Sequence, residues 1–278
     1  MAFIKTQDKT DLYVKDWGKG NLVVLIHGWP LSADSWDDID VDLVEAGYRV
    51  VAYDRRGFGR SDQPSAGYDY DTLADDLAAV LNYAFATQPA GDRATLVGFS
   101  MGGGEVARYM SRYGGKGVGK TVLLASILPF RLQTKDNPAG VAQAEFDKTE
   151  KALRTDPPHF FKGFFERFFG VTSTTRPVSP ELLAWMQTIA MQASAKATLA
   201  CLHSFSRTDF RAELDAFKVP TLIIHGTNDL IVPIENSAHQ AVEKIKHAIL
   251  REYPSAAHGL FVTERHRLVQ DLLSFLHE

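Results

Sequence analysis

The chain has 278 residues, of which 45% are hydrophobic and 23% charged, and this ordinary globular composition suits one large domain with an insertion. Its formal net charge of -4 gives no sign of the basic surface that a nucleic acid needs, so a nucleic acid is not expected as a partner. No apolar run approaches the roughly 20 residues that span a bilayer, which excludes insertion into a membrane. The single cysteine, Cys201, forms no internal disulfide and residues 1–17 lack the apolar core of a secretory signal, so we expect a cytoplasmic protein.

Short runs rich in Val, Ile and Leu alternate with stretches of helical spacing along most of the chain. The expected strands are Leu12–Trp17, Leu22–Ile26, Arg49–Tyr53, Ala94–Phe99, Thr121–Ala125, Thr221–Ile224 and Ala248–Tyr253. The expected helices are Ser35–Ala46, Asp71–Ala86, Met101–Arg112, Ile234–Ile245 and Glu264–Leu276. This alternation predicts an α/β fold built on a mostly parallel, doubly wound sheet of about eight strands.

The alternation stops between Phe130 and Lys218, where helical segments follow one another without a convincing strand. Aromatic side chains crowd into His159–Phe169 within this stretch. We therefore expect residues 130–218 to form a helical cap insertion, and residues 1–129 and 219–278 to form the α/β core. No repeat or Pro-rich linker indicates a flexible arrangement of two domains.

The segment Gly98–Gly102 has the pattern G-x-S-x-G between an expected strand and an expected helix. A sharp turn from strand to helix strains the backbone of its central residue, and small residues are needed two places before and after it. The turn also places Ser100 at a helix N-terminus, where free N–H groups favour developing negative charge. We expect Ser100 to be a nucleophile, whereas the alternative is an ordinary Gly-rich helix start.

A serine nucleophile needs a base to take its proton and an acid to orient that base. When the serine lies on this kind of turn, the acid comes next in the chain and the histidine comes last. Asp229 follows the expected strand Thr221–Ile224, and His258 follows the last expected strand. Both therefore belong at the carboxyl edge of the sheet, where open α/β sheets build their sites. The competing acid is Asp209, which follows no strand.

The other histidines fit the role of base less well. His27 and His225 stand at strand ends before glycine, where a structural hydrogen bond is expected. His159 and His203 lie in the insertion and could line a pocket, but neither follows the acid in the chain. The remaining ones lie in amphipathic or surface stretches: His239, His247, His266 and His277.

Acyl transfer also needs two N–H donors that face the developing oxyanion. One should be the backbone N–H of Met101, directly after the nucleophile. The second should come from the loop His27–Pro30, with Trp29 as the donor. Pro30 has no N–H and cannot donate, although its ring fixes the loop.

The segment Gly114–Thr121 matches the phosphate-binding pattern G-x-x-x-x-G-K-[ST]. That motif works when the loop leaves a strand and opens a helix whose N-terminus receives the phosphates. Here the order is inverted, because the segment follows a helix and enters the strand at Thr121. We interpret it as a Gly-rich helix stop and connector.

Several segments carry a pattern far more specific than G-x-S-x-G. They are VLIHGWPLSADSW (Val24–Trp36), AYDRRGFGRSDQP (Ala52–Pro64), GYDYDTLADDL (Gly67–Leu77), LVGFSMGGGEVARY (Leu96–Tyr109), TLIIHGTNDLIVP (Thr221–Pro233) and AHGL (Ala257–Leu260). On these segments, which extend over nearly the whole chain, the protein resembles the cofactor-free haloperoxidase and arylesterase group of the α/β-hydrolase fold, also called non-haem chloroperoxidases or perhydrolases.

The resemblance implies the triad Ser100, Asp229 and His258, with Trp29 and Met101 as oxyanion donors and with no cofactor or metal. It also implies an aromatic pocket, for which the candidates are Phe130, Phe161, Phe164, Phe165, Ile231 and Val232, although each aromatic could equally be packing of the cap. Family members with a proline after the oxyanion aromatic, as in this chain, favour perhydrolysis. The acidic stretch Ile39–Asp42 departs from the family pattern, and we expect it to lie away from the site.

These observations predict a serine hydrolase that acts on small carboxylic esters, with hydrogen peroxide as a second acyl acceptor and a homo-oligomer among the possible assemblies. The alternative hypotheses include a lactamase or amidase on small cyclic amides, a non-catalytic ligand-binding protein with the same fold, and a metal- or haem-dependent peroxidase. No cluster of His, Cys and carboxylate residues has metal-ligand spacing. A dehalogenase or epoxide hydrolase would carry a carboxylate where Ser100 stands.

Overall fold

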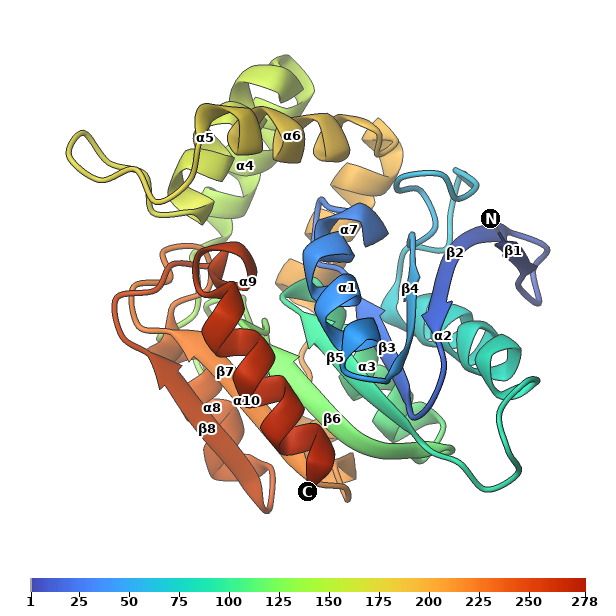
Figure 1. Cartoon of the computed structure of the whole chain (residues 1–278). Helices are drawn as coiled ribbons and strands as arrows, with labels where there is room; N and C mark the ends of the chain where they lie inside the picture. Colours follow the sequence, from blue (N-terminus) through green and yellow to red (C-terminus); the bar gives the residue numbers. More distant parts are fainter. Residues whose placement is uncertain (1) are drawn as a thin grey trace.

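The computed structural model describes residues 2–278 as one sheet covered by helices (Figure 1). The eight strands lie in the order β1-β2-β4-β3-β5-β6-β7-β8. They are β1 Ala2–Lys5, β2 Asp11–Gly18, β3 Leu22–Ile26, β4 Arg49–Tyr53, β5 Ala94–Phe99, β6 Val118–Leu124, β7 Thr221–Gly226 and β8 Ala248–Tyr253. The pairs β1–β2 and β2–β4 are antiparallel and the other neighbours are parallel, so the predicted fold class is confirmed.

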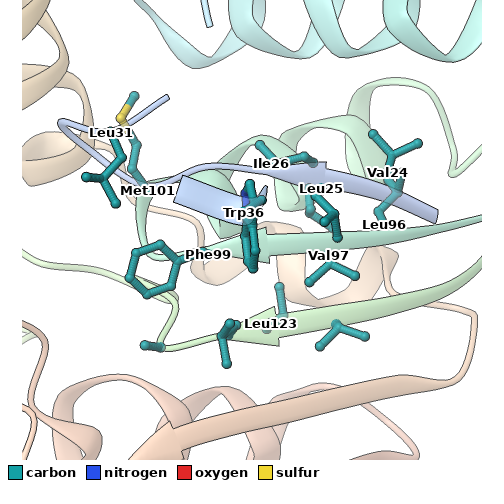
Figure 2. Packing of buried hydrophobic residues seen from close by; sticks show 14 of the residues in the cluster. Val24, Leu25, Ile26, Leu31, Trp36, Leu96, Val97, Phe99, Met101 and Leu123 are labelled. Carbon is teal, nitrogen blue, oxygen red and sulfur yellow. The ribbon is translucent and has the colours of Figure 1, made fainter. Parts of the chain in front are cut away.

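The central strands are apolar along their whole length because both faces of the sheet are covered. Every residue of β3 and β5 is buried, as expected for parallel strands between helices. Val24, Ile26 and Leu96 point to one face, and Leu25 and Val97 point to the other (Figure 2). These side chains belong to one continuous hydrophobic core.

Two layers of helices cover the sheet (Figure 1). On one face, α1 (Asp37–Glu45), which follows the short helix η1 (Ala33–Trp36), packs beside α10 (Arg265–His277). On the other face lie α2 (Tyr70–Phe85), α3 (Met101–Arg112) and α8 (Ala238–Lys244). Two short helices, η3 (Ile234–Asn236) and α9 (Leu260–Thr263), complete the core.

A helical layer lies between β6 and β7 in the chain and forms the upper part of Figure 1. It contains α4 (Gln143–Thr155), α5 (Pro157–Phe168), α6 (Pro180–Met191), α7 (Ala195–Arg207) and η2 (Arg211–Ala216). Asp156, Ser179 and Ser194 cap α5, α6 and α7, because each side chain accepts an N–H from the third residue after it. All of these helices fall inside residues 130–218, which we keep as the proposed limits of the cap.

The strand β1 is absent from the expected strands, which otherwise match the structure to within a few residues. It is short, and only Ile4 of its four residues is buried, so no alternation of apolar and polar residues marks it. Its pairing with β2, which places Ala2 opposite Val14, makes it a strand.

The Gly-rich segment that matched a phosphate loop connects α3 to β6. Gly114, Gly115 and Gly117 have φ values of 59°, 64° and 78°, a left-handed backbone that ends the helix before the strand begins. The interpretation as a connector is confirmed. Within residues 2–278, no helix combines the length and apolar character that crossing a membrane requires.

Candidate active site

Ser100 occupies the sharp turn between β5 and α3. Its φ is 52° and its ψ is -115°, a strained conformation for a residue with a side chain. The turn needs glycine on both sides: a Cβ at Gly98 would lie 2.7 Å from the carbonyl oxygen of Gly102, and one at Gly102 would lie 2.6 Å from that of Ile26. The two glycines therefore let the backbone close tightly around the serine.

Ser100, His258 and Asp229 meet at the carboxyl edge of the sheet. The Oγ of Ser100 lies 3.0 Å from Nε2 of His258, and Nδ1 of the same imidazole lies 2.6 Å from Oδ2 of Asp229. All three residues are buried. When Nδ1–H donates to the carboxylate, Nε2 has a free lone pair that accepts the serine proton.

Backbone contacts between two loops hold the acid and the histidine together. The N–H of Thr227 donates to the carbonyl of Tyr253, and the N–H of Asn228 donates to that of Ala256, each at 3.0 Å. A Cβ at Gly226 would lie 2.2 Å from the carbonyl oxygen of Ala256, so glycine permits this approach. The loops after β7 and β8 therefore lie side by side and carry Asp229 and His258 into contact.

Several donors keep Asp229 ionised. Its Oδ1 accepts the N–H groups of Ile231 at 2.9 Å and Val232 at 2.7 Å. Burial by itself raises the pKa of this carboxyl, but the neighbouring imidazoles of His258 and His225 outweigh burial and hold the pKa well below its usual range. His225 has the structural role expected of it, because its Nε2 lies 2.8 Å from the carbonyl of Val232.

Two backbone N–H groups adjoin the serine. Met101 begins α3, and a Cβ placed on Gly28, the residue before Trp29, would lie 3.0 Å from Cβ of Ser100. Among the acceptors of residues 2–278, neither the N–H of Met101 nor that of Trp29 has a partner. Both donors are therefore available to an oxyanion that forms at the serine.

A buried polar cluster lies below the start of α3. The Nε of Arg55 donates to Oε1 of Glu105 at 2.5 Å, and the hydroxyl of Tyr53 donates to Oε2 at 2.6 Å. His27 accepts the N–H of Arg55 on Nε2 at 3.0 Å and lies 2.8 Å from the carbonyl of Gly28 through Nδ1. Burial and the adjacent guanidinium lower the pKa of His27 well below its usual range, so this imidazole is neutral and structural, as expected.

A cavity of about 680 Å³ opens above Ser100, between the carboxyl edge of the sheet and the helical layer. It is lined by Trp29, Ser100, Met101, Ile127, Arg131, Val141, Glu145, Phe146, Lys148, Thr149, Ala152, His159, Phe160, Gly163, Phe164, Arg167, Leu202, Phe205, Leu230, Ile231, Val232 and Pro233. The indole of Trp29 donates to the carbonyl of Thr198 at 3.1 Å and packs 5.5 Å from the ring of Phe164. Such a volume suits a small organic molecule.

The structure separates the pocket candidates. Phe164, Ile231 and Val232 line the cavity. Phe130, Phe161 and Phe165 do not, and the expectation that they line it is corrected. On α5 the lining positions are 159, 160, 163, 164 and 167, which share one helical face, whereas Phe161 and Phe165 are buried on another. Phe130 packs against Arg211 instead, and Cζ of the guanidinium lies 5.2 Å from the centroid of the phenyl ring.

Sequence reasoning missed Arg131 and Phe160 as lining residues. Arg131 stands one place after a residue that was expected in the pocket, in a loop without periodicity, so no sequence signal gave its orientation. Phe160 lies in the aromatic run His159–Phe169, and a helical wheel of α5 would have selected it. His159, which the sequence left open as a pocket residue, lines the cavity.

No group of three or more His, Cys, Asp or Glu side chains in the described part of the chain is arranged to hold a metal ion. The charged lining residues of the cavity do not converge into a ligand set either, since Lys148 and Glu145 pair with each other at 3.9 Å.

A mostly parallel sheet, a strained serine at a strand-to-helix turn, and an acid and a histidine after later strands define a protein of the α/β-hydrolase class. The profile of the alpha/beta hydrolase fold family matches residues 21–265, and the chain belongs to that family. The resemblance derived from the sequence motifs is thereby confirmed at the level of the family.

Comparison with individual proteins shows which members of this family the chain is similar to. A putative non-heme chloroperoxidase from Synechocystis is 46% identical over 267 residues, which cover 96% of this chain and 95% of the relative. The bifunctional esterase/perhydrolase DCH of Acinetobacter calcoaceticus is 39% identical, with 99% of each chain covered. A bromoperoxidase crystal structure from Bacillus anthracis is 42% identical and superposes with a TM-score of 0.94 over 100% of this chain and 99% of the other.

Proposed function

We propose that the protein is a serine hydrolase that cleaves small carboxylic esters through an acyl-enzyme. The single observation that carries the proposal is the continuous contact from Ser100 through His258 to Asp229, with distances of 3.0 Å and 2.6 Å. The cavity above the serine has room for a small ester, and the likeness to an esterase/perhydrolase supports the same chemistry.

The reaction follows from the atoms in contact. Nε2 of His258 takes the hydroxyl proton while Oγ of Ser100 bonds to the ester carbon, and the N–H groups of Trp29 and Met101 stabilise the oxyanion. The intermediate collapses when the imidazolium returns its proton to the departing alcohol, which leaves an acyl-serine. Water then adds to the acyl carbon by the same relay, and the acid is released with the serine regenerated.

Removal of the serine hydroxyl tests this assignment. Ser100→Ala should lower kcat/KM for p-nitrophenyl acetate by at least about 10⁴-fold, because the variant has no atom that can hold the acyl group. Circular dichroism should be unchanged. Ser61→Ala is the matched control, since it also removes a buried hydroxyl but one that donates to the carbonyl of Asp54, outside the cavity, and its turnover should stay within a few-fold of the parent.

Labelling with a fluorophosphonate separates an enzyme from a ligand-binding protein that has only kept the fold. We expect one label per chain, located by mass spectrometry on Ser100, and none on Ser100→Ala. Folded protein that takes up no label, or a Ser100→Ala variant that hydrolyses the ester at the parental rate, would overturn the proposal.

We further propose that hydrogen peroxide competes with water for the acyl-serine. Attack by peroxide would release a peracid in place of the acid and regenerate the same serine, so it needs no additional residue. Pro30 beside the oxyanion donor Trp29 and the perhydrolase activity in a relative's name support this proposal.

Assembly into a homo-oligomer and a cytoplasmic location stay predictions from the sequence.

The test is a comparison of products from one short-chain ester, with and without added peroxide. Peracid should accumulate only in the presence of peroxide and only with an intact Ser100, while the rate of ester consumption is maintained or raised. Consumption of the ester with acid as the sole product at every peroxide concentration would contradict the perhydrolase proposal and leave the esterase proposal standing.

A further inference from the structure

An arginine lies in the wall of the cavity that contains Ser100. Arg131 belongs to the loop between β6 and α4, and only 6% of its surface is exposed. The same loop lies against the nucleophile, because the N–H of Ile127 donates to the carbonyl of Ser100 at 3.3 Å. Arg131, Ile127 and Ser100 all line the cavity, so the arginine and the serine border the same space.

The guanidinium of Arg131 is largely without partners. It carries five N–H donors. Its Nη2 donates to the carbonyl of Ile231 at 2.7 Å, and its buried Nε has no hydrogen-bond partner among the described residues. No carboxylate of residues 2–278 forms an ion pair with it, in contrast to the buried Arg55, which pairs with Glu105. A buried cation without a counter-ion is unfavourable unless a bound group pairs with it.

The charge of Asp229 acts on the pKa of Arg131, but the oxygens of this carboxylate are already engaged. Oδ1 accepts two backbone N–H groups, and Oδ2 accepts from His258. Burial lowers the pKa of Arg131 to about 10 and the charge of Asp229 opposes that decrease, so the guanidinium is still charged at neutral pH. The carboxylate therefore serves the histidine and leaves the arginine's remaining donors open.

Besides Arg131, the cavity lining carries three other charged side chains, and their sum is positive. Lys148 and Glu145 compensate each other as a pair 3.9 Å apart. Arg167, at the end of α5, is exposed and has no ion-pair partner among the described residues. The remaining lining consists mainly of aromatic and aliphatic side chains, such as those of Trp29 and Phe164.

We propose that Arg131 binds a carboxylate of the substrate, so that the preferred substrates are small esters that carry a second, ionised acid group. This inference rests on the proposed esterase function and names its substrate class. A planar guanidinium matches a carboxylate through parallel N–H donors. One buried cation balances one negative charge, which favours a carboxylate over a phosphate group with a charge of nearly two.

The test compares charged and neutral esters of the same shape. Monoethyl adipate against diethyl adipate places the charge on the acyl part, and 4-acetoxybenzoate against its methyl ester places it on the alcohol part. Wild-type enzyme should prefer the charged member of at least one pair, and that pair identifies the side of the ester that Arg131 contacts. Turnover of the neutral members reports the esterase function independently of the inference.

Substitution of the arginine should abolish this preference. Arg131→Met, which has similar length and no charge, should lower the charged-to-neutral ratio of kcat/KM on the order of 30-fold, mainly through KM, while Arg131→Lys should retain part of the ratio. Arg207→Met is the matched control: it removes the same charge from an exposed position at the end of α7 that does not line the cavity, and it should change the ratio no more than about threefold, in a salt-dependent manner.

The possible outcomes separate the two proposals. If wild-type enzyme turns over neutral esters but Arg131→Met leaves the ratio unchanged, the arginine only braces the carbonyl of Ile231 and the inference is wrong. If neither member of any pair is turned over, the esterase proposal itself fails.

A measurement on the wild-type protein covers the case in which the variants do not fold. Glutarate should inhibit hydrolysis of p-nitrophenyl acetate competitively, with an inhibition constant about tenfold or more below that of the neutral glutaramide. Equal inhibition by the two compounds would overturn the inference without any substitution.

Discussion

Asp229 and Asp40 are both buried carboxyl groups, with 4% and 1% of their surfaces exposed. Their surroundings nevertheless shift the pKa of the two groups in opposite directions. Asp229 receives N–H donors and imidazoles, which keep it ionised. Neither oxygen of Asp40 has a hydrogen-bond partner among the described residues, and burial together with the charge of Asp37 raises its pKa to about 8. The sequence marked Ile39–Asp42 only as an acidic departure away from the site. The structure shows that Asp40 faces the interior from α1.

Asp40 should make stability depend on pH. Between a pKa of about 4 in the unfolded chain and about 8 in the folded protein, unfolding releases a proton, so stability falls as pH rises through this window. The free energy of unfolding of Asp40→Asn should therefore match that of the parent near pH 4 and exceed it by about 4 kcal/mol at pH 7, as measured by urea unfolding. Asp38→Asn changes a neighbouring acid whose side chain is 72% exposed and serves as the control. A difference that does not vary with pH would contradict the assignment.

At the scale of elements, the β5–α3 turn determines where Ser100, the proposed nucleophile, lies. The strand and the helix are each predictable from their own residues, but the approach of Gly98 to Gly102, and of Gly102 to the end of β3, exists only when they pack. The positive φ of Ser100 follows from that packing. Strain of this kind persists because the surrounding sheet and helix hold it in place.

Gly98→Ala should destabilise the protein by at least about 2 kcal/mol and abolish turnover, because the added Cβ meets backbone atoms of α3 that cannot rotate away. Gly163→Ala is the control on a helix where an added Cβ meets nothing within 4 Å, and it should raise stability by up to about 1 kcal/mol. Thermal unfolding of both variants checks the pair. Equal effects would show that backbone contact does not explain the need for glycine at the turn.

At the scale of the whole molecule, the cluster of Glu105, Arg55, Tyr53 and His27 joins the ends of β3 and β4 to the first turns of α3. These residues come from three separate segments of the chain and are nearly completely buried. A buried guanidinium and carboxylate that satisfy each other fix the relative positions of the elements around Ser100. Loss of one partner leaves the other charge unpaired in the interior.

Glu105→Gln should lower the free energy of unfolding by about 3 to 5 kcal/mol, since Arg55 would keep its charge and lose its counter-ion. The urea midpoint measures the effect. Glu150→Gln is the control, because it removes the same charge from an exposed pair with Arg154 on α4, and its midpoint should not move. A buried pair that proved as dispensable as the exposed one would refute this role for the cluster.

The sequence by itself determined the fold class, the order of strands β2 to β8 along the chain, and the choice of Ser100, Asp229 and His258 as candidates. These predictions depend on local information: apolar periodicity, turn residues, and chemistry that must follow strand ends. The same local signals identified Gly114–Thr121 as a connector, because the order of the neighbouring helix and strand excludes a phosphate loop.

Only the tertiary structure decided which side chains line the cavity and which are buried without partners. Orientation in a loop or around a helix depends on what packs against it, so Phe161 and Phe165 turned out to face the interior while Phe160 lines the cavity. The environments of Arg131 and Asp40 are likewise set by residues distant in the chain, among them Ile231 and Asp229 for the arginine. The sequence shows that a residue can carry a charge. Whether that residue is buried, and whether it has a counter-ion, is decided only when the chain folds.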